Sequence, residues 1–175
     1  QMQRTLGGIV RLNRTLLLLT KIDNGQFPES TEVDIAGLVR EQVALCEEIY
    51  ESRGIACSVN CAGPLAVRMN ESLASVLVAN LVKNAFIHTA AGGGIRIDIE
   101  DRTLSVANDG DASLDGEHIF ERFYHVDKSH SKASGGTGLG LSIVKHAVQY
   151  HRGTVELQSE EGKGTTIRIL LPEEN

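Results

Sequence analysis

The chain has 175 residues, 41% of them apolar, and a formal net charge of −6 at pH 7. This length and apolar content suffice for one hydrophobic core with an appendage. The acidic balance argues against nucleic-acid binding through a basic face, so any phosphate recognition has to be local, through backbone amides, a metal ion and a few cations.

The first segment is predicted to be an apolar helix. Its apolar residues recur at intervals of three and four, and a stop signal follows at Asp23-Asn24-Gly25. The longest purely apolar run, Leu16 to Leu19, is too short to cross a membrane. A helix of this composition needs a partner, which is either the domain that follows it or a helix outside this chain. The residues of its apolar stripe are Ile9, Leu12, Leu16 and Leu19, widened by Val10, Leu17 and Leu18.

Strands and helices alternate from Thr31 onward. Short strands are predicted at Glu32 to Asp34, Ile55 to Asn60 and Leu65 to Met69, the last two as a pair. Helices are predicted over Ile35 to Arg53 and Glu71 to His88.

Two hairpins with period-two alternation complete the predicted sheet. They join Gly94–Glu100 to Thr103–Asn108, and Thr154–Ser159 to Thr165–Leu171. The elements together predict an α/β (α+β) fold, a two-layer α/β sandwich in which a mixed sheet carries helices on one face, preceded by a single amphipathic helix.

A glycine-rich segment, Gly135 to Ser142, runs into the last predicted helix. Glycines leave backbone N–H groups free to approach phosphate oxygens, and the dipole at a helix N-terminus favours an anion. Without other signals, such a turn is more often a flexible connection.

Two asparagines upstream strengthen the phosphate interpretation. Asn80 and Asn84 lie one turn apart on one stripe of an otherwise apolar helix, and His88 lies a turn further. A neutral amide oxygen is a suitable ligand for Mg²⁺ that already shares the charge of a triphosphate. The alternative is a surface helix with two solvated side chains.

The asparagine stripe and the glycine segment together resemble the catalytic and ATP-binding domain of sensor histidine kinases of two-component systems. That domain has the Bergerat (GHKL) fold, shared with gyrase, MutL and the heat-shock chaperone ATPases. Five segments of the chain follow the order of the family's motifs. They are Asn80–Ala85 (N box), Ala107–Asp111 (first glycine box), Ile119–Tyr124 (F box), Gly136–Leu141 (second glycine box) and Gly162–Thr166 (closing Gly-x-Gly-Thr).

The resemblance implies ATP and Mg²⁺ as ligands. It implies catalytic roles for Asn80 and Asn84, with Asn84 as the Mg²⁺ ligand, and a lid at 127–137 that moves in the absence of nucleotide. In the F box, Phe120, Phe123 and Tyr124 are expected to anchor that lid. The residues implied to bind nucleotide are Asn80, Asn84, His88, Asn108, Gly110, Leu114, Lys132, Gly136, Thr137, Gly138, Leu139, Gly140, Leu141 and Thr165.

The chain departs from the family at Ile87, Asn108 and Ala112. Asn108 stands where the family has an aspartate that accepts from the adenine amine, and a neutral acceptor makes a weaker bond. Asn108-Asp109-Gly110 is also a turn signal in its own right. These departures keep open a second interpretation, a non-catalytic or weakly binding dimerisation or scaffold module with a degenerate pocket. A protein-serine kinase of the anti-sigma type is a third, disfavoured by the leading apolar helix.

By the same resemblance, residues 1–27 correspond to the second helix of the dimerisation and phosphoacceptor hairpin, and residues 28–175 to the catalytic domain. None of the six histidines has the acceptor pattern, a histidine followed by an acidic and then a basic residue. The implied activity is transfer of the γ-phosphoryl of ATP to a histidine of that hairpin, in the same protein or its dimer mate. The resemblance also implies that the phosphoryl group passes on to a response regulator and that the intact protein is a homodimer.

The remaining histidines and the cysteines carry no metal-site pattern. His146 and His151, five residues apart, do not share a helix face well enough for zinc, and both are expected at the surface. Cys46, Cys57 and Cys61 are expected to be free, buried or half-buried thiols of a reducing cytoplasm. A cytoplasmic location is therefore expected for this fragment, with any inner-membrane anchor in a region that precedes it.

Overall fold

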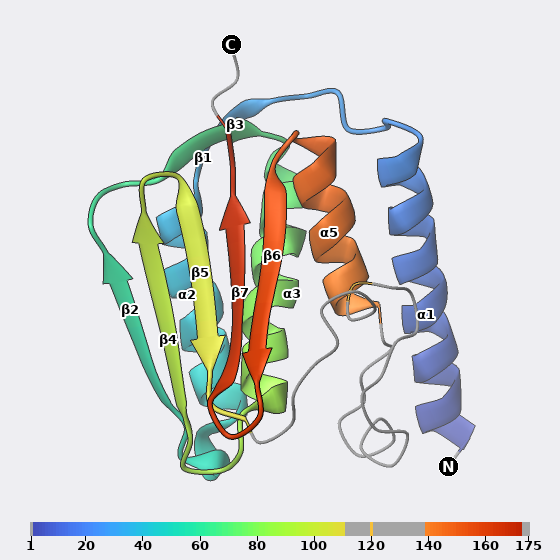
Figure 1. The fold of residues 1–175 in the computed structure, drawn as a ribbon. Coiled ribbons are helices and arrows are strands. Elements are labelled where there is room, and N and C mark those ends of the chain that lie inside the picture. Colours follow the sequence, from blue (N-terminus) through green and yellow to red (C-terminus); the bar gives the residue numbers. More distant parts are fainter. Residues whose placement is uncertain (1, 111–119, 121–138, 173–175) are drawn as a thin grey trace.

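The computed structural model describes residues 2–110, 120 and 139–172. In this part of the chain a mixed sheet lies in front of α2, α3 and α5, and α1 stands beside α5 (Figure 1). The predicted two-layer sandwich with helices on one face is confirmed.

The main sheet has the strand order β2-β4-β5-β7-β6. β2 and β4 are parallel, and every other neighbouring pair is antiparallel. Both predicted hairpins are confirmed, and the first turns through Asp101 and Arg102 at φ 46° and 64°, the left-handed conformation of a tight hairpin turn. The strands are β2 (Ala56–Cys61), β4 (Gly94–Glu100), β5 (Thr103–Asn108), β6 (Thr154–Glu160) and β7 (Gly164–Leu170).

The predicted pairing of the two early strands is wrong. β3 (Ala66–Met69) pairs antiparallel with β1 (Thr31–Asp34) in a separate two-stranded sheet, while β2 joins β4. Alternation of apolar and polar residues defines which face of a strand is buried, but it does not define the neighbour.

Helices α2 and α3 begin at residues whose side chains cap them. α2 (Ile35–Ile49) follows Asp34, whose Oδ1 accepts from the Gly37 N–H at 3.0 Å, and α3 (Glu71–His88) follows Asn70, whose Oδ1 accepts from Leu73 N–H at 3.1 Å. α2 is shorter than predicted: it ends at Ile49, and the short helix η1 (Glu51–Arg53) turns the chain toward β2.

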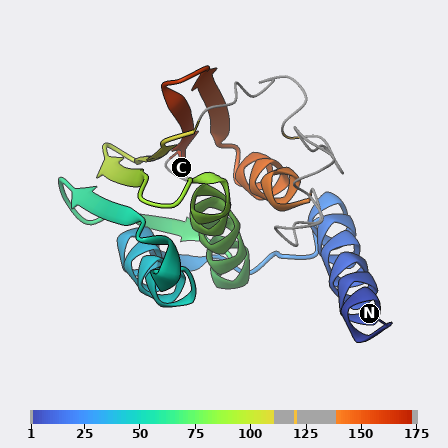
Figure 2. The ribbon, with the colours of Figure 1, turned by 90° about the horizontal axis from the view of Figure 1, so that it is seen from below.

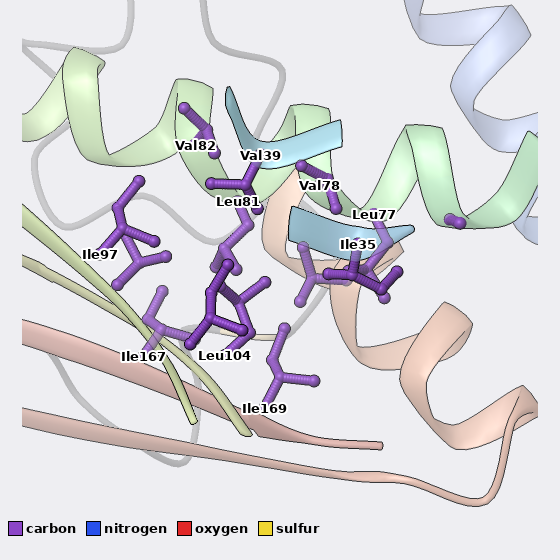
Figure 3. Packing of buried hydrophobic residues seen from close by; sticks show 14 of the residues in the cluster. Ile35, Val39, Leu77, Val78, Leu81, Val82, Ile97, Leu104, Ile167 and Ile169 are labelled. Carbon is purple, nitrogen blue, oxygen red and sulfur yellow. The ribbon is translucent and has the colours of Figure 1, made fainter. Parts of the chain in front are cut away.

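Figure 2 shows α2, α3 and α5 (Gly140–Tyr150) lying along one face of the sheet. Their apolar stripes meet the inward side chains of the strands, as Figure 3 shows for the residues around Leu81 and Ile97, both fully buried. At about 25 cal/mol per Å² of buried apolar surface, this layer is the main source of stability.

Helix α1 (Met2–Asp23) packs against α5. Leu19, Leu139 and Ile143 form a small buried cluster there, apart from the main core. His146 Nδ1 lies 2.7 Å from Asp23 Oδ1, and the Tyr150 hydroxyl donates to the backbone oxygen of Phe27 at 2.9 Å. Within this chain, the partner of the apolar helix is thus the domain that follows it. No helix in the described part of the chain is both long and apolar enough to cross a membrane.

The two histidines expected at the surface are both partly buried and have partners. The His146 side chain is 27% exposed and contacts Asp23. His151 accepts from the Asn70 N–H through Nε2 at 3.3 Å, and its Nδ1 lies 2.9 Å from the Ala147 oxygen. The helical pattern around them does not reveal that α1 and the N-cap of α3 pack against this end of α5.

Candidate functional site

The asparagine stripe of α3 meets the second glycine box at the start of α5. Asn80 is half-buried, and its Nδ2 donates to the Val76 oxygen at 2.8 Å. A Cβ placed on Gly140 would lie 3.2 Å from Asn80 Oδ1, so the two residues are in close contact. Two segments far apart in the sequence, each predicted to bind nucleotide, therefore lie side by side.

Asn84 lies one turn further along α3 and is also half-buried. Among the described residues, none makes a hydrogen bond with the Asn84 side chain, so none of them occupies its amide oxygen. The described residues hold no cluster of three or more His, Cys, Asp or Glu side chains that could bind a metal ion by themselves. A divalent ion at Asn84 would thus need oxygen ligands from phosphate and water, the environment that Mg²⁺ prefers.

The residues predicted to meet the base lie at one end of the sheet. Asn108 is the last residue of β5 and is opposite Ile95 of β4 and Thr165 of β7. The Thr165 and Ser159 hydroxyl oxygens are 3.0 Å apart, and Asn108 Nδ2 donates to the Asp109 oxygen at 3.3 Å. A hollow of about 520 Å³ opens at this end of the sheet, with Asn108 and Thr165 among its lining residues. Most of its lining, including Ser58, Arg96 and Thr166, belongs to the face of the sheet away from the helices, so the hollow is not the space between α3 and the sheet.

The last turn of α3 lies beside the first glycine box. A Cβ on Gly110 would be 3.9 Å from the His88 oxygen and 3.8 Å from Asn108 Nδ2. His88 and Gly110, both predicted to bind nucleotide, are therefore neighbours across the gap between helix and sheet.

Asp109 shows that the Asn108-Asp109-Gly110 segment is also a structural turn. Its Oδ2 accepts from the Gly94 N–H at 2.8 Å, and its own N–H donates to the Gly94 oxygen. The turn interpretation and the nucleotide interpretation are compatible, because the Asp109 side chain makes the bond to Gly94, whereas Asn108 is in register with Ile95 and Thr165, both buried on the helix side of the sheet.

The structure explains why position 164, at the start of β7, has to be glycine. Gly164 has φ +96°, and a Cβ there would overlap the backbone oxygen of Asn108. Only glycine allows β7 to start this close to the end of β5.

Leu139 and Leu141 have buried side chains, the first in the cluster with α1 and the second in the main core. Their predicted role is therefore limited to backbone groups. Phe120 is 8% exposed and belongs to the main core, as expected for an anchor. Leu114, Lys132, Gly136, Thr137 and Gly138, together with Ala112, Phe123, Tyr124 and the lid at 127–137, lie outside the described residues, and their roles stay predictions.

The cysteines are free, as expected: Cys46 is buried, and Cys57 and Cys61 are half-buried. Burial raises the pKa of Cys57 to about 11, and burial likewise raises the pKa of Cys46. Both thiols are therefore protonated and unreactive near neutral pH.

Residues 69–175 match the model of the histidine kinase-, DNA gyrase B- and HSP90-like ATPase family. This match covers more than half of the chain, and the chain belongs to that family.

Two curated proteins that are similar to this chain are named as sensor proteins, one of them a histidine kinase. The chain is 34% identical over 170 residues to the sensor-like histidine kinase SenX3 of Mycolicibacterium smegmatis, covering 90% of this chain and 43% of the relative. It is 34% identical over 174 residues to the phosphate regulon sensor protein PhoR of Pseudomonas aeruginosa, covering 95% of this chain and 39% of the relative. The chain thus spans less than half the length of these relatives.

The solved catalytic domain of histidine kinase ThkA is similar in fold, with a TM-score of 0.69 and 27% identity, over 83% of this chain and 96% of that one. The mycobacterial sensor histidine kinase MprB superposes with a TM-score of 0.67 at 25% identity, over 82% of this chain and 97% of that one. The chain is an ATPase domain of the histidine kinase type, and the scaffold alternative is not favoured.

Proposed function

We propose that this domain binds Mg-ATP between α3, the Asn108–Thr165 end of the sheet and the start of α5. It then transfers the γ-phosphoryl group to a histidine outside this chain, for relay to a response regulator. The observation that carries the proposal is the contact between Asn80 and Gly140, because it joins the asparagine stripe to the glycine segment.

In this proposal the phosphate end of the nucleotide lies at the asparagines. Asn84, half-buried and without a hydrogen-bond partner in the described part of the chain, holds Mg²⁺ through its amide oxygen, with Asn80 in support. When bound, Mg²⁺ shares the negative charge of the triphosphate.

The base end lies where His88, Asn108, Gly110 and Thr165 come together. The Asn108 amide oxygen accepts from the adenine amine in place of the carboxylate usual in the family. A neutral acceptor makes a weaker bond, which predicts a modest affinity.

Transfer depends on position and charge neutralisation, since a neutral imidazole nitrogen already carries the lone pair that attacks the phosphorus. The acceptor imidazole belongs to a dimerisation hairpin, and residues 1–27 are the second helix of that hairpin. The intact protein is a homodimer. The exposed apolar residues of α1 support this assignment: Ile9, Val10 and Leu17 are 58%, 51% and 56% exposed, a surface that a partner helix would cover. We place the domain in the cytoplasm, where ATP and a response regulator are available.

The test is calorimetry with Mg-ATP, followed by phosphorylation of a separately supplied acceptor hairpin. Asn84→Ala is expected to lower the transfer rate at least 100-fold, because the metal ligand is lost. Asn60→Ala is the matched control, since Asn60 is exposed on the open face of the sheet and bonds Asp98. It should leave transfer within twofold of the unmodified chain.

Two results would contradict the proposal. No heat at millimolar nucleotide would favour the scaffold interpretation, and full transfer by Asn84→Ala would refute the assignment of the metal ligand. Gly138→Val, in the glycine segment, provides a second substitution that is expected to remove transfer.

A further inference from the structure

We infer that Arg53 is a positioning residue for the base end of the nucleotide site. It sets the distance between the last turn of α3, which carries His88, and the turn at Asn108–Gly110. This inference rests on the proposed function, because it assigns a role within the same site.

The side chain of Arg53 caps the C-terminus of α3. Its Nη1 donates to the Phe86 oxygen at 2.7 Å, and its Nη2 donates to the Thr89 oxygen. The last carbonyls of a helix have no partner inside the helix, and a cation is favoured at that end of the dipole. The two acceptors flank His88 in sequence, so the guanidinium holds the turn that carries this residue.

Aromatic packing fixes the guanidinium in place. The Arg53 Cζ atom lies 5.6 Å from the centroid of the Tyr50 ring, and Tyr50 stacks on Phe86 with centroids 5.8 Å apart. Phe86 is 1% exposed, so this stack is anchored in the core. The planar guanidinium of an arginine can donate to two carbonyl oxygens while it lies over an aromatic ring. A lysine ammonium cannot make the two hydrogen bonds in the same geometry.

The backbone of Arg53 is hydrogen-bonded to the segment between α3 and β4, which leads to the first glycine box. Its oxygen accepts from the Gly92 N–H at 2.8 Å, and Gly93 accepts from the Ala56 N–H. Gly94, the next residue, donates to Asp109 Oδ2 at 2.8 Å. Two hydrogen bonds, joined by the covalent backbone from Gly92 to Gly94, therefore connect Arg53 to the first glycine box, while its side chain holds α3.

Arg53 thus contacts the last turn of α3 directly and is linked to the first glycine box through the backbone of Gly92 to Gly94. In the described part of the chain, Arg53 makes no hydrogen bond to Asn80, Asn84 or Gly140, at the phosphate end. Its loss is expected to weaken nucleotide binding more than it slows phosphoryl transfer at saturating ATP.

Arg53→Gln tests this expectation, with Arg102→Gln as the matched control. Arg102 also donates to two backbone oxygens, those of Leu171 and Pro172, but at the far end of the sheet. We expect Arg53→Gln to raise the Kd for Mg-ATP and the KM for ATP about tenfold, with kcat within twofold. Arg102→Gln should leave all three within twofold.

Backbone amide resonances supply a readout independent of nucleotide. Arg53→Gln should shift the amides of His88, Gly94 and Asp109 in the nucleotide-free protein, while Arg102→Gln leaves them in place. Arg53→Lys keeps the charge without the fork and should raise the Kd in the same direction, so it serves if Arg53→Gln does not fold.

An unchanged Kd in Arg53→Gln or Arg53→Lys, or equal effects of Arg53→Gln and Arg102→Gln, would overturn the inference. If the unmodified chain binds no Mg-ATP, the proposed function fails. The resonance comparison then still decides whether Arg53 positions His88.

Discussion

Helix α5 packs against two hydrophobic groups of very different size. On one side Val144, Ala147 and Val148 belong to the main core, which includes residues from α2, α3 and the strands of the main sheet. On the other side Ile143 and Leu139 meet Leu19 of α1 in a small cluster. The same helix therefore joins a cohesive domain to a helix held by few buried contacts. Because the cluster that holds α1 is much smaller than the main core, α1 can separate from α5 without unfolding of the domain.

The small cluster is nevertheless close to the candidate site. Leu139 directly precedes Gly140, and Val76, which packs on the cluster, accepts the hydrogen bond from Asn80 through its backbone oxygen. The weaker contact thus involves residues next to both segments that are expected to hold phosphate.

The largest effect is expected from a cavity in the main core. Leu81 of α3 is fully buried (Figure 3), and Leu81→Ala should lower the free energy of unfolding by about 2–5 kcal/mol. Urea denaturation followed by circular dichroism measures this change. Leu45→Ala is the control, because Leu45 is 52% exposed on α2 and should cost less than about 0.5 kcal/mol. Equal losses in the two variants would show that the packing around α3 is not as described.

A truncation in the small cluster should act only on α1. Leu19 is fully buried between α1 and α5, and Leu19→Ala should weaken that contact by about 2–3 kcal/mol. Amide hydrogen exchange is expected to accelerate in α1, while the amides of α3 and β4 keep their protection.

The control for this second substitution is Leu17→Ala, since Leu17 lies on the same helix but is 56% exposed. It should leave exchange in α1 unchanged. Faster exchange throughout the domain in Leu19→Ala would mean that α1 and the domain unfold as one unit, and that the small cluster is not independent of the main core.

Much of this fold could be predicted from local patterns. Period-two alternation located both hairpins, and helical spacing located α3 with its two asparagines. The partner of β2 could not be predicted, because Val59 and its neighbours fit any adjacent strand that offers a buried face. Pairing of β1 with β3 joins residues more than thirty positions apart in the chain, such as Asp34 and Ala66, which no local pattern encodes.

The candidate site shows the same limit. The sequence indicated Asn80, Asn84 and Gly140 through spacing and glycine content, but it gave no signal for Arg53. A lone arginine before a glycine is common on protein surfaces, and its two carbonyl partners are contributed by a helix more than thirty residues away. The contact exists only because the end of α2 packs beside the end of α3.

The smallest expected effect is a loss of unfolding free energy at alkaline pH, and it comes from Cys57, which packs against the main core. Burial raises the pKa of Cys57 from 9.0 to about 11, so the unfolded chain loses this proton more readily than the folded one. The stability that this thiol contributes is fully present below about pH 9 and is lost as the pH rises toward 11. Two pKa units correspond to at most about 2.7 kcal/mol, and the half-buried position of Cys57 reduces that figure through solvent screening.

Urea denaturation at pH 8 and pH 10.5 should therefore show a lower free energy of unfolding at the higher pH. Cys57→Ala should make this loss smaller, whereas Leu19→Ala should leave it as large as in the unmodified chain, because Leu19 lies in the other hydrophobic cluster. An identical loss with and without the Cys57 thiol would assign the alkaline effect to other groups. Tyr50 and Cys46, whose pKa values burial also raises, are then the ones to substitute next.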